Sequence, residues 1–76
     1  MSLVKEHDRV VLKADLPGEK LTAGDVGTVV HVHSDGKAYE VEFVALDGES
    51  VAVITLESSQ VRPVERMEIT HARRVA

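Results

Sequence analysis

The chain has 76 residues and a formal net charge of −4, with no cysteine, no tryptophan, one tyrosine and one phenylalanine. This length limits it to one domain with a marginal core, and the absence of cysteine excludes disulfides and thiolate metal sites. No apolar run reaches the roughly 18 residues of a membrane span, and residues 1–3 are too short to be read as a signal peptide. The absence of cysteine fits a reducing compartment, and we expect a cytoplasmic protein.

The first predicted strand covers residues 7–13 and shows the period of two that is typical of β-structure. Val10 and Leu12 fall together on one of its faces. The next stretch, residues 14–24, contains one proline and two glycines and therefore cannot continue the strand. It predicts a long irregular loop whose two leucines pack back onto the fold.

The second predicted strand covers residues 24–33 and has a glycine, Gly27, in its interior. An interior glycine indicates a bulge, a bend or a close approach of another chain segment. A tight Asp-Gly turn at residues 34–37 then leads to a third strand at residues 38–43. This strand alternates cleanly, so we expect its aromatic and valine side chains to face the core and its glutamates to face water.

The fourth predicted strand, residues 50–56, is apolar on both faces. One face carries Val51, Val53 and Thr55, and the other carries alanine, isoleucine and leucine. Only one face can point into the core, so a loop, the tail or a partner must cover the other, or it stays exposed.

A single 3₁₀ turn at residues 57–60 precedes the last predicted strand, residues 61–64, where Pro63 lacks an N–H and requires an edge position. The order of strands and the loop lengths predict an all-β fold, a five-stranded SH3-like barrel with a long first loop. We place this barrel at residues 1–65 and a basic C-terminal tail at residues 66–76.

The tail permits three structures. Met67, Ile69, Ala72 and Val75 form a stripe in a helix, alternate residues among them also fit a strand, and an arm docked on another subunit is the third alternative. Residues 1–65 carry six basic and twelve acidic side chains and so −6, whereas the tail carries three arginines and one glutamate and so +2. The tail arginines are either solvated or contact an acidic surface, including that of a second copy. They are Arg66, Arg73 and Arg74.

Two histidines, His31 and His33, are the candidate metal ligands, because residues two apart on a strand share a face. His7 on the first strand is a possible third imidazole, but zinc requires about four ligands with an ordered second shell. Surface histidines beside a turn explain the pattern without a metal. We therefore predict neither a metal nor another cofactor.

Catalytic chemistry finds little support. Glu40 and Glu42 share a face, but general acid/base catalysis needs at least one of them buried and perturbed, and their alternation with core residues places both on the face in water. Their contact with histidine across the hairpin, such as Glu42 with His31, is explained by cross-strand pairing. The sequence has neither a glycine-flanked serine elbow nor a phosphate loop before a helix. We predict that the protein is not an enzyme.

Two resemblances to known families rest on particular stretches. DRVVL together with AGDVGTV is similar to the KOW motif of ribosomal and transcription-elongation barrels, which implies contact with RNA or the ribosome. LPGEKLTAGDVGTVVHVH, AYEVEF and LDGESVAVITLESSQVRPV resemble an uncharacterised bacterial family of short SH3-like barrels, a domain of unknown function. That second resemblance spans nearly the whole barrel and implies a fold and a bacterial setting.

These observations predict a non-enzymatic protein-interaction module that self-associates. The contact residues would be Val51, Val53 and Thr55 together with the tail arginines, and an antitoxin-like or accessory role toward a basic partner fits the acidic body. An RNA- or ribosome-associated module is the alternative, although the acidic charge disfavours nucleic acid. The scarcity of aromatic residues disfavours proline-rich peptides and stacked bases.

Overall fold

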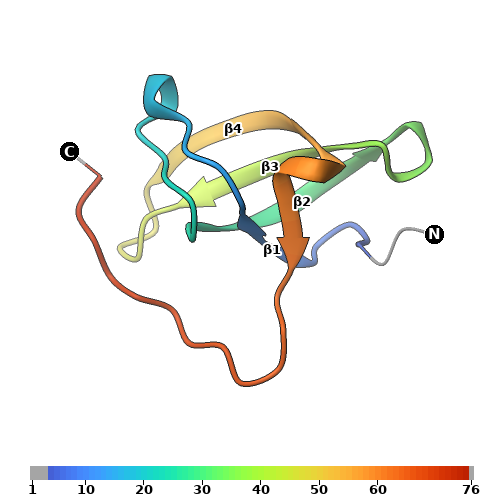
Figure 1. Cartoon of the computed structure of the whole chain (residues 1–76). Coiled ribbons are helices and arrows are strands. Elements are labelled where there is room, and N and C mark those ends of the chain that lie inside the picture. Colours follow the sequence, from blue (N-terminus) through green and yellow to red (C-terminus); the bar gives the residue numbers. More distant parts are fainter. Residues whose placement is uncertain (1–3, 76) are drawn as a thin grey trace.

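Runs of β-branched residues separated by Gly-, Pro- and Asp-rich turns fold into five strands, as the sequence predicts. The computed structural model describes residues 4–75 (Figure 1); Met1–Leu3, the stretch considered above as a signal peptide, and Ala76 lie outside the described residues. The strands are β1 (Arg9–Leu12), β2 (Val26–His33), β3 (Ala38–Val44), β4 (Ser50–Glu57) and β5 (Val61–Pro63). Three 3₁₀ turns accompany them: η1 (Pro17–Glu19), η2 (Ser34–Gly36) and η3 (Ser58–Gln60).

All strand pairs are antiparallel, and the sheet order is β4-β3-β2-β1-β5. The central strand β2 pairs with β1 through Val26–Thr28 and with β3 through Thr28–His33, so its two ends serve different parts of the sheet. The fold is therefore all-β and of the small SH3-like barrel type. Within residues 4–75 no strand pairing joins β4 to β5, which form the two margins of the sheet.

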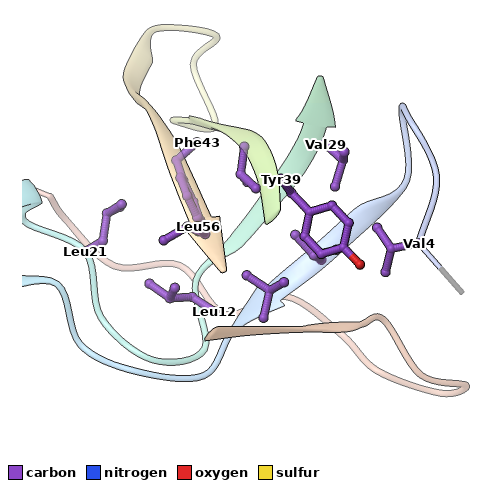
Figure 2. Packing of buried hydrophobic residues seen from close by; sticks show 10 residues of the cluster. Val4, Leu12, Leu21, Val29, Tyr39, Phe43 and Leu56 are labelled. Carbon is purple, nitrogen blue, oxygen red and sulfur yellow. The ribbon is translucent and has the colours of Figure 1, made fainter. Parts of the chain in front are cut away.

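The core fills the concave side of this curled sheet (Figure 2). Val10, Val29 and Val41 are completely buried and come from β1, β2 and β3. Both aromatic side chains of the protein are also buried there. The prediction that the third strand turns its aromatic and valine side chains inward is therefore confirmed.

The long first loop packs as a compact excursion. Leu16 and Leu21 form an isolated antiparallel bridge, in which each backbone N–H donates to the other residue's carbonyl at 2.8 and 3.2 Å. Leu21 is buried in the core and Leu16 is partly buried against it. The predicted packing of the two loop leucines is confirmed.

The tail forms neither a helix nor a strand within the described residues 64–75. It leaves β5, passes through a turn at residues 65–68 and returns along the barrel toward the first loop (Figure 1). The helical and strand alternatives for the tail are thus wrong. Side-chain contacts with the barrel, and not a repeating backbone structure, hold this segment.

Gly27 provides the close approach that the sequence offered as one of three explanations. A Cβ atom at this position would lie 2.5 Å from Val41 Cγ1 and 2.9 Å from Phe43 Cε1. Those two atoms belong to buried core side chains of β3, and side chains in a close-packed interior move only at a cost. The missing side chain lets Val41 and Phe43 pack against the backbone of β2 at this short distance.

We predict that Gly27→Ala destabilises the protein by about 1–3 kcal/mol, because the added methyl group overpacks the core. Urea denaturation of the variant and the natural chain measures the difference. Gly18→Ala is the matched control, because nothing lies within 4 Å of a Cβ atom there and its φ is not positive. Equal stability of the two variants would contradict the close-approach role of Gly27.

Candidate interaction surfaces

The outer face of β4 carries the aliphatic residues that the sequence identifies as a contact surface. Val53 is 52% exposed, and Thr55 on the same face is exposed too. The structure differs from the prediction at Val51, which is partly buried against the core. A β-bulge between Phe43 and Val44 leaves Val51 as the extra residue on β4, which interrupts the alternation of faces.

Polar side chains from three strands surround this aliphatic face. Glu40 on β3 accepts a hydrogen bond from the Thr55 hydroxyl at 2.8 Å and lies 3.3 Å from His33 Nε2. The Thr55 hydroxyl group, and secondarily His33, hold the pKa of Glu40 below its usual range. The second histidine, His31, stacks edge-on against His33 with ring centroids 4.5 Å apart, and its Nδ1 lies 3.6 Å from Glu6.

The register of β2 explains which glutamate meets the histidines. A bulge between Val29 and His31 places His31 opposite Glu40 and leaves Glu42 opposite Thr28. The expected pairing of Glu42 with His31 is therefore wrong, since the extra residue in β2 shifts the pairs that follow it.

These histidines share a face, as predicted, but residues 4–75 contain no group of three or more His, Asp or Glu side chains placed to hold a metal. His7, the suggested third ligand, is exposed in a turn before β1. The surface is thus a hydrogen-bonded polar network bordering aliphatic side chains.

A second surface forms where the tail leaves the barrel. Arg62 on β5 donates from Nη1 and Nη2 to the two carboxylate oxygens of Glu68, at 2.9 and 2.6 Å. The Glu68 carboxylate also accepts from the backbone N–H of Glu65 at 2.6 Å. These bonds close the turn at residues 65–68, within which Met67 has a left-handed backbone with φ of 66°. The guanidinium group of Arg62 lowers the pKa of Glu68 to about 2.

The far end of the tail is fixed at the start of β2. Arg73 donates from Nε to Asp25 Oδ1 at 2.8 Å, from Nη2 to Asp25 Oδ2, and from Nη2 to the Lys20 carbonyl at 3.1 Å. Asp25 also accepts from the Thr22 N–H at 2.9 Å. The Arg73 guanidinium group holds the pKa of Asp25 below its usual range, although partial burial opposes the shift. Such a two-pronged pair fixes orientation as well as charge.

A groove of about 200 Å³ lies between the docked tail and the barrel. Apolar side chains from β2, β3, β4 and the turn that follows β3 line one wall, and residues 70–73 and Val75 of the tail line the other. The barrel residues include Val26, Phe43, Val44 and Val51. The tail thus forms one wall of an apolar groove that has an acidic group, Asp25, at its rim.

The three tail arginines have different surroundings. All three are exposed, and Arg73 forms the ion pair with Asp25. Sequence reasoning did not identify Asp25, Arg62 or Glu68 as contact residues. The available signal was the position of Asp25 directly after a turn glycine, but such acids are common in turns without any long-range partner.

The fold and surfaces define a small all-β protein of the SH3-like barrel type. Residues 6–63 match the family model described as Domain of unknown function (DUF4926), which covers most of the chain, so the chain belongs to this family. The resemblance to a family of unknown function is confirmed. No curated protein and no solved structure matches the chain. In the described part of the chain, no helix is long and apolar enough to cross a membrane.

We predict that Glu68 stabilises the protein in a pH-dependent way. Its pKa is about 2 in the folded protein against an ordinary 4.5, so its contribution is present above pH 4.5 and is lost as the pH falls through 2. The stability difference between the natural chain and Glu68→Gln, measured by thermal unfolding, should shrink over this range.

The carboxyl titration of Glu68, followed by NMR, provides the direct check. We expect a midpoint near 2 in the natural chain and a clearly higher midpoint in Arg62→Gln, which lacks the guanidinium group. An unchanged midpoint in Arg62→Gln would show that this ion pair does not hold the turn.

Proposed function

We propose that this protein is a non-enzymatic interaction module that self-associates through the free margin of β4. The observation that carries the proposal is an eight-residue margin strand with an exposed aliphatic side chain, Val53, near its middle. The same module would present its acidic body to a basic protein partner, in an antitoxin-like or accessory role. A cytoplasmic setting belongs to the same proposal.

The margin of β4 has the features of a pairing surface. Within the described residues, 50–56 make no backbone hydrogen bonds other than those of the ladder with β3. An exposed edge of this kind offers unpaired N–H and C=O groups to another strand. Two copies related by a two-fold axis can pair these edges antiparallel and continue one sheet through both barrels. Val53 lies near the middle of the strand, where such pairing brings side chains of the two copies together.

Several properties support binding over catalysis. No polar or charged side chain among residues 4–75 is buried. Each carboxyl group with a clearly displaced pKa, namely Asp25, Glu40 and Glu68, is shifted downward by a hydrogen-bonded partner. A catalytic acid or base instead requires a pKa brought close to the working pH.

The surface chemistry also favours a protein partner over nucleic acid. Tyr39 and Phe43 are the only tyrosine and phenylalanine of the chain, which has no tryptophan, and both are buried, so bases have no exposed phenol, phenyl or indole ring to stack on. The charge of −6 on residues 1–65 repels phosphate and attracts a basic protein.

We predict that Val53→Lys weakens self-association by roughly tenfold or more, because it removes the burial of one valine and places two like charges near the two-fold axis. Light scattering over a range of concentrations measures the dissociation constant. Val64→Lys is the matched control, since Val64 is 44% exposed and follows β5 at the other margin. A monomeric natural chain, or equal weakening by both variants, would contradict the proposal.

The alternative RNA-binding function has its own test. The exposed basic residues of β1 and of the loop after it would have to contact phosphate; they are Arg9, Lys13 and Lys20. We expect no binding of single-stranded or duplex RNA at low salt, where electrostatic attraction is strongest. Salt-sensitive binding that is lost in Lys13→Glu would replace the proposed function with the RNA-binding one.

A further inference from the structure

The end of the tail that lines the groove and the connection that leads to it differ in how well they are held against the barrel. Residues 70–73 and Val75 line the groove, and Arg73 is held by Asp25 and by the Lys20 carbonyl. The connection before them is poorly packed. Met67 and Ile69 are 89% and 93% exposed, although both are large apolar residues.

The connection also contains an unfavourable backbone conformation. Met67 has φ of 66°, in the left-handed region that non-glycine residues rarely adopt. The turn is held there by the Glu68 carboxylate, which bonds Arg62 and the Glu65 N–H. The turn therefore holds a strained residue in order to direct the tail back onto its own barrel.

We propose that residues 70–75 exchange between two copies of this chain, so that each tail docks in the groove of the other copy. This arrangement deepens the proposed self-association and rests on it. Every groove contact is kept in the exchange, including the pair between Arg73 and Asp25, because the two copies are identical. What changes is the connection alone.

An open connection accounts for two features of the closed form, the left-handed backbone of Met67 and the exposed apolar side chains of Met67 and Ile69. An extended hinge releases Met67 from the left-handed conformation. Two extended connections that run antiparallel past each other about the two-fold axis can bury Met67 and Ile69 of both copies. Charge favours the same occupant, since the basic tail of one copy meets a barrel whose residues 1–65 carry −6.

Two substitutions at the hinge should shift the equilibrium in opposite directions. Met67→Gly adopts positive φ without strain and favours the closed monomer, whereas Met67→Pro cannot adopt it and favours the open hinge. Neither substitution disturbs the barrel, because Met67 is exposed and lies after β5. We expect the dimer dissociation constant to rise by roughly tenfold in Met67→Gly and to fall by a similar factor in Met67→Pro.

Intermolecular NMR identifies the exchanged segment. Because the chain has no cysteine, Arg74→Cys accepts a single spin label beside Arg73. Spin-labelled chains at natural isotope abundance are unfolded and refolded together with unlabelled ¹⁵N chains. Exchange predicts broadening of the groove amides, such as Val26 and Val44, in the ¹⁵N chains, and stronger broadening when both chains carry Met67→Pro.

The outcomes separate this proposal from the one it rests on. A dimer without broadening in the groove, abolished by Val53→Lys, would overturn tail exchange and leave association through β4 intact. Broadening that persists in Val53→Lys would support exchange and count against β4 as the contact. A Met67→Pro chain that is monomeric with its tail undocked would also overturn the exchange.

Discussion

The close packing of Val41 and Phe43 of β3 against Gly27 of β2 is the constraint on which the rest of this structure depends. β2 pairs with β1 at its first residues and with β3 along its remainder, and Gly27 lies beside Thr28, which pairs with both. The absence of a side chain at Gly27 permits this packing, because the space a methyl group would need is already filled by Val41 and Phe43. A chain of 76 residues has few other core contacts with which to compensate for an error at this position.

Most of the fold is predictable from the sequence, because most of it follows from local patterns. Alternation and turn residues locate all five strands to within about two residues of their observed ends, because the period of two and the Asp-Gly turns are local properties. The bulges at Val30 and Val51 are not local. Each relieves a mismatch between curled strands, and each shifts the residues after it, which is why Val51 packs inward and Glu40, in place of Glu42, meets the histidines.

The route of the tail could not be predicted from the sequence, for a different reason. Its route depends on an ion pair between residues 48 positions apart, Arg73 and Asp25, and on a second pair between Arg62 and Glu68. No periodic pattern encodes either pair, and the tail's apolar residues fit helix and strand equally well. The charge asymmetry between body and tail indicated that the two attract, but only the folded barrel places Asp25 at the rim of a groove.

The two margin strands of the sheet, β4 and β5, differ in length, proline content and charge, and this difference bears on function. β5 has only three residues, contains Pro63, and carries Arg62, whose guanidinium group is occupied by Glu68. Short length, proline and charge are the devices by which proteins prevent a margin strand from pairing with another chain. β4 has none of them: it has eight residues, no proline, and a single charged residue, Glu57, at its end. A chain that protects one margin against pairing and leaves the longer one open has the asymmetry expected if β4 is kept available for a partner.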